Sequence, residues 1–521
     1  MPLYRSLLLA LLAGALNILS FAPFGLWPLQ ILSLAAVLAL ALRVGSCKRS
    51  ALVGWAYGFG WTGCGVYWLY ISMHDFGGMA APIAALAVIL LALFLGGYAA
   101  LAFGLSAWLR RRWHASAPSV ALLVFPALWA LTEWLRGWVF TGLPWVSSGY
   151  AHTASPLAGY APLLGVYGLA WISALIAGCL TLLATRKAPL ALVLALGLGL
   201  MLLAGGLGLK TIHWTSAAGQ PITVRLLQGN VAQEMKFARE QISASLTLYQ
   251  EMITAAPADL IATPETAIPL FEQQLPPDYL PQLADFARRS GSHLAIGIPL
   301  SDDPQHYANS VIGIAPELKA AAYRYDKHHL VPFGEFIPTG FRWFVDMMHI
   351  PLGDFGSGPA VQAPFAVKDQ WLLPNICYED LFGEEIAGQL AASHFAGAPV
   401  ATLLLNVSNI AWFGDTIALP QHLQISQMRA LETGRPMLRA TNTGTTAVID
   451  PQGRVSAQLP HYQRGTLSAT VQGMQGMTPY ILAGNAVMLA LAALALLAGW
   501  LGSRKNRNDH RNRAASPRID G

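Results

Sequence analysis

The stretch Leu372-Leu-Pro-Asn-Ile-Cys-Tyr-Glu-Asp380 joins a short apolar run directly to a thiol and two acids. Residues Leu372–Ile376 have the length and composition of a buried strand, and Cys377 follows at once. Functional side chains collect at strand ends when strands alternate with helices. The stretch therefore predicts an α/β layered fold with Cys377 at the end of a strand.

The surrounding sequence, residues 211–477, repeats this alternation and predicts a sheet structure covered by helices. The predicted strands are Ile222–Gln228, Leu260–Thr263, His293–Ile298, Val311–Ala315, Ala321–Tyr325, Leu372–Ile376, Thr402–Asn406 and Thr445–Ile449. The predicted helices are 238–254, 277–290, 382–394 and 420–432.

Outside this region the composition is that of a membrane protein. The 521 residues are 54% hydrophobic and only 11% charged, whereas soluble domains carry about 25% charge. Apolar stretches long enough to cross a bilayer are predicted near 6–22, 26–42, 51–72, 81–107, 119–138, 162–184, 188–209 and 480–500. The first stretch resembles a signal peptide, but seven further spans favour an uncleaved helix.

These spans predict four parts of the chain. Residues 1–210 form a membrane domain with seven transmembrane helices, and residues 211–477 form the catalytic domain. An eighth transmembrane helix lies within 478–502. The basic tail, 503–521, is expected to be disordered.

The positions of basic residues predict the orientation of the chain in a membrane. Lys and Arg cluster in 43–50, 108–118, 185–187 and the tail, while 22–26, 73–80 and 139–161 contain none. By the positive-inside rule both termini are cytoplasmic and residues 211–477 lie outside the cytoplasm. The net charge of +5 therefore reflects membrane-flanking loops and does not predict nucleic-acid binding.

The four cysteines are too scattered to predict a disulfide or metal framework. Cys377 is alone in the 211–477 region, so that domain cannot contain an internal disulfide. No cysteine and histidine spacing predicts zinc. No metal and no cofactor are expected.

Three segments, each at or after a predicted strand, supply an acid, a lysine and a thiol. They are Thr263-Pro-Glu-Thr-Ala-Ile-Pro269, Tyr325-Asp-Lys-His-His-Leu-Val-Pro-Phe-Gly-Glu335 and Asn375-Ile-Cys-Tyr-Glu-Asp380. A thiol needs a base or a cation to attack at neutral pH. Glu265 is the candidate base, Lys327 the candidate stabiliser of thiolate and oxyanion, and Cys377 the candidate nucleophile of an acyl transfer.

These segments resemble the Glu-Lys-Cys triad of the nitrilase superfamily. Together with the spans they resemble bacterial apolipoprotein N-acyltransferases. The resemblance extends to Leu227-Gln-Gly-Asn230, Val331-Pro-Phe-Gly-Glu335, Ser408-Asn-Ile-Ala-Trp-Phe-Gly414, Phe21-Ala-Pro-Phe-Gly25, Gly58-Phe-Gly-Trp61 and Glu133-Trp-Leu-Arg-Gly137. It implies a bacterial inner-membrane protein with a polytopic α-helical membrane domain plus an α/β nitrilase-like α-β-β-α sandwich, the latter in the periplasm. It also implies transfer of a phospholipid acyl chain, usually sn-1, through a Cys377 thioester. The acceptor would be the α-amino group of a diacylglyceryl-cysteine at an apolipoprotein's N-terminus.

The resemblance also implies supporting residues. Glu335 and Glu379 are expected to orient Lys327 or the thiol, and the Tyr378 amide to donate to the oxyanion. The expected substrate-binding residues are Phe237, Trp343, Phe344 and Trp412. Two positions depart from the family: Ile410 stands where an Asp is usual, and Phe237 replaces a Trp of some members.

Several features have a structural as well as a functional reading. Glu133 and Arg136 share a face of a predicted membrane helix and are either functional or a structural pair. His328 and His329 are expected to be structural. Residues 341–350 form either a core helix or a mobile flap that touches the outer leaflet.

Two other functions compete with acyl transfer to a lipoprotein. A membrane-tethered amidase or nitrilase would use the same triad but leaves seven N-terminal spans unexplained. A transporter or sensor with a binding-only nitrilase fold is disfavoured because all three triad residues are present.

Overall fold

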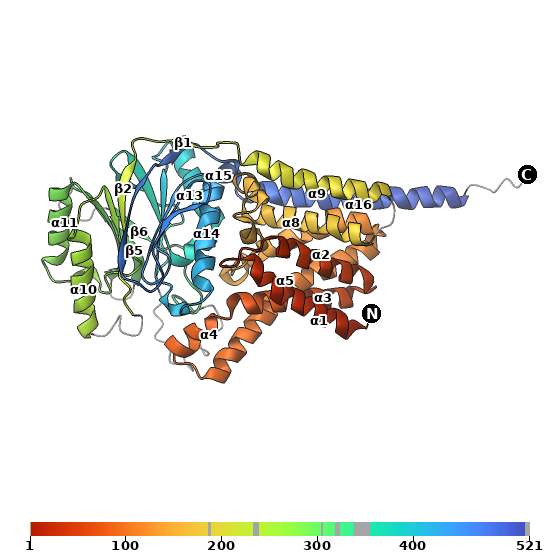
Figure 1. The fold of residues 1–521 in the computed structure, drawn as a ribbon, viewed down its shortest axis with the longest axis horizontal. Helices are drawn as coiled ribbons and strands as arrows, with labels where there is room; N and C mark the ends of the chain where they lie inside the picture. Colours follow the sequence, from red (N-terminus) through yellow and green to blue (C-terminus); the bar gives the residue numbers. More distant parts are fainter. Residues whose placement is uncertain are drawn as a thin grey trace, which may run out of the picture. The chain divides into compact units, whose positions relative to one another are not determined.

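Apolar sequence on both sides of residues 211–477 forms helices in the computed structural model, which describes residues 2–185, 189–232, 239–303, 306–317, 323–337 and 355–515. The chain divides into two units (Figure 1). The helical unit comprises residues 1–67, 85–212 and 485–521, and the sheet unit comprises residues 68–84 and 213–484.

The helical unit is built from long apolar helices joined by short turns. The helices are α1 (Leu3–Asn17), α2 (Pro28–Arg43), α3 (Cys47–Val66), α5 (Ala81–Trp113), α6 (Ala117–Ser119), α7 (Phe125–Arg136), α8 (Ala161–Thr185), α9 (Pro189–Leu209) and α16 (Ala486–Ala515). The turns are η1 (Ile18–Ser20), η3 (Val120–Val124), η4 (Val139–Thr141), η5 (Ser148–His152) and η6 (Pro156–Tyr160). Among the described residues, six helical stretches are long and apolar enough to cross a bilayer. This is the composition of a multi-pass membrane protein.

Burial differs sharply between two neighbouring helices. α8 packs against α2, α7 and α9, and 78% of its apolar stretch is buried. In α9 only 11% is buried, although its mean hydropathy is 2.5. An apolar helix that protein does not cover needs a non-aqueous neighbour, and a bilayer supplies one.

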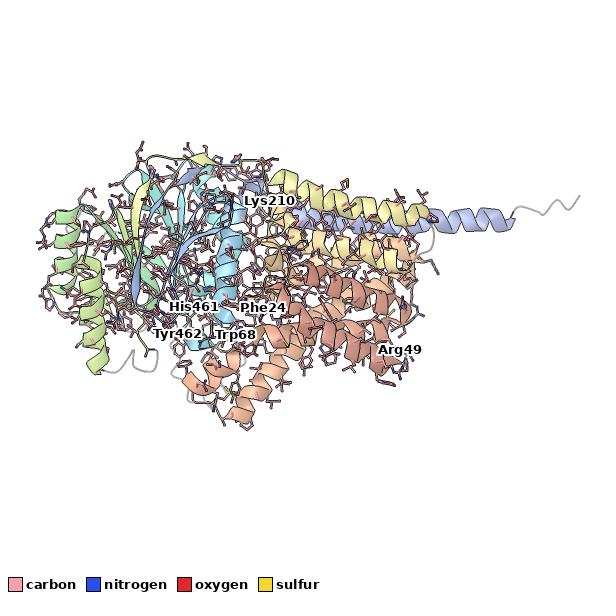
Figure 2. All side chains as sticks on the ribbon, viewed as in Figure 1. Phe24, Arg49, Trp68, Lys210, His461 and Tyr462 are labelled. Carbon is pink, nitrogen blue, oxygen red and sulfur yellow. The ribbon has the colours of Figure 1, made fainter. Side chains whose placement is uncertain are left out.

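Small residues allow close helix packing in this unit. A Cβ on Gly14 of α1 would lie 2.0 Å from the Tyr57 carbonyl oxygen of α3, and one on Gly60 would lie 2.3 Å from the Leu11 carbonyl oxygen. Such approach through glycine is typical of membrane helices. Figure 2 shows Phe24 and Lys210 at one end of the helical unit and Arg49 at the other, so predicted outer and inner connections lie at opposite ends.

Glu133 and Arg136 form a buried structural pair. Arg136 donates to the carbonyl oxygens of Leu143 and Trp145 at 3.2 and 2.8 Å. The Ser148 amide donates to Glu133 at 2.9 Å, and the two charges lie 3.7 Å apart. The pair therefore holds the connection that follows α7, which supports the structural reading of these residues.

The sheet unit contains two six-stranded sheets. Their orders are β13-β2-β3-β4-β5-β6 and β12-β11-β10-β9-β8-β7. The strands are β2 (Ile222–Gln228), β3 (Leu260–Ala262), β4 (His293–Asp303), β5 (His306–Ile314), β6 (Tyr323–Asp326), β7 (Phe365–Val367), β8 (Gln370–Ile376), β9 (Leu403–Ser408), β10 (Met437–Thr441), β11 (Ala447–Ile449), β12 (Val455–Gln458) and β13 (Gly465–Val471). A small separate sheet pairs β1 (Ser216–Ala217) with β14 (Met474–Gln475).

Four layers result from how these sheets bury their faces. The helices are α10 (Arg239–Thr254), α11 (Tyr279–Ser290), α13 (Gly383–Phe395), α14 (Ala418–Thr433) and α15 (Pro479–Ala483). On β2, Val224 and Leu226 join the core between the sheets, whereas Leu227 faces the core under α10 and α11. Ile386 of α13 and Leu423 of α14 pack on the second sheet. The predicted α-β-β-α sandwich is confirmed (Figure 1).

One part of the sheet unit comes from far away in the sequence. The segment 68–84, which includes α4 (Leu69–Ile71) and η2 (Ser72–Phe76), packs on η10 (Ala411–Phe413). The rings of Trp68 and Phe413 lie 4.2 Å apart. Trp68 is only 2% exposed, so this contact buries a large apolar side chain.

Candidate active site

Cys377 occupies a sharp turn at the end of β8. Its φ is +52°, a conformation that a residue with a Cβ adopts only when its surroundings hold it. The 3-10 turn η9 (Cys377–Leu381) begins at this residue. The parallel pairing of β8 with β9 fixes the strand that delivers the thiol. The nucleophile candidate is thus presented from a strand end, as the sequence predicted.

Glu265 lies in a loop after β3 that is wrapped onto β4. The Thr263 amide donates to the Ala295 carbonyl, and the Gly297 amide donates to the Thr263 hydroxyl, both at 3.0 Å. The backbone approaches so closely that a Cβ on Gly297 would lie 2.2 Å from the Pro264 carbonyl oxygen and 3.0 Å from the Glu265 Cα. Glycine at 297 is therefore a condition for the position of Glu265.

We expect Gly297→Ala to lower the rate of acyl transfer by about 10²-fold, because a shift near 1 Å in a catalytic group costs about that much. The cost in stability should be about 1–3 kcal/mol, since the new methyl group overpacks the loop. Initial rates and the thermal unfolding midpoint of the purified protein measure both effects. Gly388→Ala in α13 is the matched control, because no atom lies within 4 Å of its Cβ position. Equal rates for both variants would contradict the prediction.

Lys327 is buried between two carboxylates. Its Nζ donates to Glu335 Oε1 at 2.8 Å and lies 3.6 Å from Glu265 Oε1. The Lys327 amide donates to the Asn309 carbonyl at 2.8 Å, which ties the residue after β6 to β5. Glu335 is held in turn by the Val331 amide at 2.9 Å. The lysine is 1% exposed, so its charge interacts with these acids and not with solvent.

The charges of this cluster determine the protonation of the thiol. Burial raises the pKa of Cys377 well above its ordinary value, the Glu265 charge raises it further, and Lys327 opposes them. Burial alone would lower the pKa of Lys327, but the Glu335 and Glu265 carboxylates outweigh it and raise that pKa. The resting site therefore holds a protonated thiol and a protonated lysine. Attack by sulfur needs a base. Of the two carboxylates beside Lys327, Glu265 raises the pKa of Cys377 more than Glu335 does, so Glu265 stays the candidate base.

Glu379 braces the turn that carries Cys377. Its carboxylate accepts the amides of Ile376 at 2.6 Å, His328 at 2.7 Å and His329 at 3.3 Å. Burial raises the pKa of Glu379 to about 7, while these amides and the charge of Lys327 oppose the shift. One side chain thus joins the β8 end to the segment after β6. An orienting role for Glu379 stays a prediction, and these three contacts are compatible with it.

Two sequence profiles cover most of the chain. "Apolipoprotein N-acyltransferase N-terminal domain" matches residues 13–179 and "Carbon-nitrogen hydrolase" matches residues 217–480. The apolipoprotein N-acyltransferase of Ralstonia nicotianae is 53% identical over 94% of this chain and 92% of its own. The chain belongs to the apolipoprotein N-acyltransferase family. It is an enzyme with a nitrilase-like domain.

Further relatives agree with this membership over nearly their whole length. Apolipoprotein N-acyltransferases of Nitrosomonas europaea and Bordetella bronchiseptica are 45% and 43% identical, each over 97% of this chain and 99% and 98% of their own. The crystal structure of an amidase from Nesterenkonia sp. is 17% identical, with a TM-score of 0.37, and covers 52% of this chain and 96% of that one.

The substrate-binding residues predicted for this apolipoprotein N-acyltransferase family member are only partly described. Phe237, Trp343 and Phe344 lie outside the described residues, as does the predicted flap at 341–350. Trp412 is 38% exposed, and its ring meets that of Phe76 edge-on at 5.9 Å. Tyr378 is largely buried with its ring 5.3 Å from that of Phe382.

Three residues with uncertain roles have apolar or structural surroundings. Ile410 is 1% exposed, so an apolar side chain suits this position. His328 Nδ1 is 2.7 Å from the Gly358 carbonyl oxygen. The His329 ring stacks on that of Phe382 at 3.5 Å. These contacts support the structural reading of both histidines.

Asn309 was missed by sequence reasoning. Its Nδ2 donates to Glu265 at 2.6 Å and to Glu335 at 3.2 Å, so it spaces the two acids around Lys327. The Asn409 amide similarly donates to Glu265 at 2.8 Å. The available signal was the polar pair Asn309-Ser310 directly before the apolar end of β5, Val311–Ile314.

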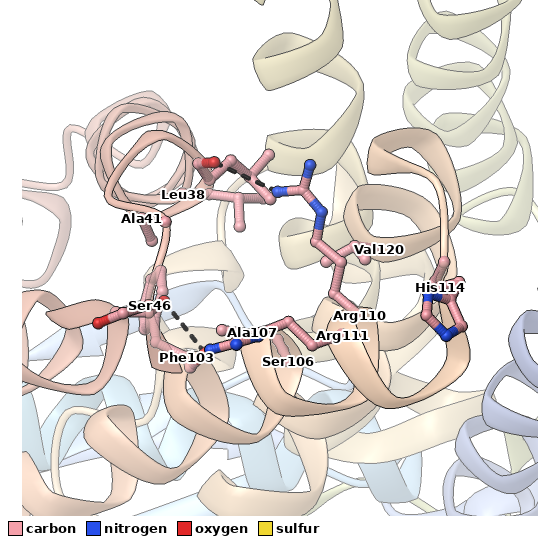
Figure 3. A pocket seen from close by; sticks show the side chains of 14 residues that line it. Leu38, Ala41, Ser46, Phe103, Ser106, Ala107, Arg110, Arg111, His114 and Val120 are labelled. Carbon is pink, nitrogen blue, oxygen red and sulfur yellow. Dashed lines mark hydrogen bonds between the residues drawn. The ribbon is translucent and has the colours of Figure 1, made fainter. Parts of the chain in front are cut away.

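The described residues offer other features, but none with a thiol and a base together. No group of three or more His, Cys, Asp or Glu in the described ranges is placed to hold a metal ion. A cavity of about 450 Å³ lies in the helical unit and is lined by Leu38, Ser46, Arg110 and Val120 among others (Figure 3). Arg110 donates to the Leu42 carbonyl at 3.2 Å there. Cys377, Glu265 and Lys327 therefore stay the candidate catalytic residues.

Proposed function

We propose that this enzyme transfers a fatty acyl chain from the sn-1 position of a phospholipid to an apolipoprotein. The acceptor is the α-amino group of the N-terminal diacylglyceryl-cysteine, and the acyl chain passes through a Cys377 thioester. The observation that carries the proposal is the buried Lys327 between Glu265 and Glu335, charge-coupled to Cys377 in a chain rich in apolar helices.

The first half-reaction loads Cys377. Glu265 takes the thiol proton while sulfur attacks the ester carbonyl of the phospholipid. The negative charge that forms on the carbonyl oxygen is stabilised by the Lys327 ammonium and the Tyr378 amide. When the intermediate collapses, the C–O bond breaks and the proton on Glu265 passes to the leaving lysophospholipid alkoxide.

The second half-reaction empties Cys377. The acceptor amine attacks the thioester carbonyl, Glu265 takes a proton from the nitrogen, and the C–S bond breaks. An amide forms, and the thiolate recovers the proton from Glu265. Because the acyl chain stays on Cys377 after the lysophospholipid has left and before the acceptor reacts, the kinetics are ping-pong. Water must be excluded during this step, since hydrolysis of the thioester would waste the acyl chain.

The proposal includes an orientation. Basic residues flank the connections at 43–50, 108–118 and 185–187 and fill the tail, which supports cytoplasmic termini and a periplasmic catalytic domain at 211–477. Both substrates are amphiphiles of the outer leaflet in that arrangement, so donor and acceptor reach the enzyme from the same membrane surface.

Intact mass spectrometry of the purified protein with phospholipid tests the chemistry. The expected result is a mass increase of one acyl chain that hydroxylamine removes, present in the protein and in Cys64→Ala, and absent in Cys377→Ala. Lysophospholipid should appear in equal amount. A membrane-tethered amidase would instead cleave a small amide without retaining any lipid-derived mass, and that outcome would overturn the proposal.

A further inference from the structure

Two buried side chains hold the backbone carbonyl of Cys377. Asn406 Nδ2 donates to this oxygen at 3.3 Å, and His422 Nε2 lies 3.2 Å from it. His422 is on α14 and is 1% exposed. The positive φ of Cys377 costs about 1–3 kcal/mol in isolation. Contacts on its peptide group are therefore needed to keep the turn in place.

The neighbour of His422 determines which ring nitrogen carries the hydrogen. Arg439 Nη2 lies 3.0 Å from His422 Nδ1. A guanidinium only donates, so Nδ1 must accept and Nε2 must carry the hydrogen. Burial lowers the pKa of His422 far below its ordinary value, and the charge of Arg439 lowers it further. The ring is thus a neutral donor aimed at the Cys377 carbonyl.

Asp380 closes these contacts into a ring. Its carboxylate lies 3.2 Å from Arg439 Nη1, and both side chains are fully buried. The Ser426 hydroxyl bonds to both of them. Asp380 belongs to η9, the same turn that Cys377 begins. A series of side-chain contacts therefore connects η9 back to the Cys377 carbonyl. Asp380 contacts Arg439, Arg439 donates to His422, and His422 donates to the carbonyl oxygen.

We propose that His422 is a positioning residue that aims the Tyr378 amide at the carbonyl oxygen of the acyl group. The C=O of Cys377 and the N–H of Tyr378 belong to one peptide plane and point in opposite directions in a trans bond. Among the described residues the cis bond is Ala22-Pro23, so the bond after Cys377 is trans. Hydrogen bonds to the Cys377 carbonyl oxygen therefore also fix the direction of the Tyr378 N–H. This inference rests on the proposed function, because it assumes acyl transfer at Cys377.

Two reactions of the Cys377 thiol distinguish a role of His422 in orienting the Tyr378 amide from a general disturbance of the active site. Acylation by phospholipid develops charge on a carbonyl oxygen, whereas alkylation by iodoacetamide displaces iodide from a saturated carbon and forms no oxyanion. We expect His422→Leu and His422→Asn to slow acylation by about 10²-fold, the usual cost of one lost oxyanion donor. The apparent KM for phospholipid and the iodoacetamide rate should stay within about twofold of wild type, the normal scatter for groups that do not act in the step measured.

A conservative substitution of His422 is expected to restore the acylation rate. The glutamine amide nitrogen reaches about as far as His Nε2, so His422→Gln should recover most of the acylation rate. Asparagine is also an amide but is too short to reach the Cys377 carbonyl. If His422→Leu does not fold, the comparison of Gln with Asn still decides, because the two differ in reach and not in chemistry. His394→Leu on the exposed face of α13 is the control and should behave as wild type.

Each remaining result counts against the inference. Equal slowing of acylation and alkylation would mean that His422 acts on the thiol or on folding. Unchanged acylation in His422→Leu and His422→Asn would mean that the carbonyl contact has no catalytic effect. Failure of the proposed function is distinguishable, because the wild-type protein itself would then form no hydroxylamine-labile acyl adduct.

Discussion

Glutamine in place of Glu265 is expected to slow acyl-enzyme formation by about 10³-fold at pH 7, within the range typical of a lost general base. Glutamine keeps the shape of the side chain but cannot take a proton. The thiol pKa is raised by burial, so few molecules carry a thiolate without that base. Single-turnover acylation with excess phospholipid measures the step directly.

The pH dependence of this variant identifies the cause. Once the base is gone, the thiolate must form by loss of the proton to solvent. Below the raised pKa of Cys377 the thiolate fraction increases about tenfold per pH unit. The rate of Glu265→Gln should therefore climb through the alkaline range, whereas the wild-type rate should climb less. Glu272→Gln, at an exposed position of the same unit, is the control. A variant rate that is low but parallel to wild type at every pH would argue against a proton-transfer role.

Lys327→Met is expected to cost both activity and stability. Methionine matches the lysine stem but leaves Glu265 and Glu335 facing each other without a cation. Removing one partner of a buried ion pair costs about 3–5 kcal/mol because the remaining charge is uncompensated. Acylation should fall by at least about 10³-fold, since an oxyanion donor and a positioning charge are lost together. Thermal unfolding in detergent and acylation rates give the two readouts.

A second substitution distinguishes the loss of activity from the loss of stability. Lys327→Met combined with Glu335→Gln removes one of the two uncompensated charges, so part of the lost stability should return. Activity should not return, because the ammonium group is still absent. Recovery of acylation in the double variant would contradict a direct role of Lys327 in the reaction. A stability loss below about 1 kcal/mol in Lys327→Met would contradict the burial argument.

The sequence was most informative where the chemistry lies at strand ends. The apolar run before Cys377 predicted β8, and the segments around Glu265 and Lys327 follow β3 and β6, so the cluster could be anticipated from local patterns. Asn309 and His422 could not, because their partners are distant in sequence and only the folded chain brings them together. The local sequence pattern identifies which residues lie at a strand end, but not which residues from distant parts of the chain contact them.

Strand β10 escaped prediction for a related reason. Its sequence, Met437-Leu-Arg-Ala-Thr441, places an arginine in the middle of a short run, which disfavours a buried strand. The structure buries Arg439 nonetheless, because Asp380 and Ser426 accept from its Nη1 and His422 accepts from its Nη2. The packing of Trp68 on Phe413 could not be predicted from the sequence either, because nothing in residues 68–84 indicates a partner beyond residue 400.

The contact between Trp68 and Phe413 also determines when this part of the protein can fold during synthesis. Trp68 and Phe413 are separated by 345 residues, and ribosomes add about 5–20 residues each second. Trp68 is therefore synthesised roughly 20 to 70 seconds before its partner. Throughout that interval the ring contact between Trp68 and Phe413 cannot form. Because segment 68–84 belongs to the sheet unit, folding of that unit is completed only after translation has passed residue 413.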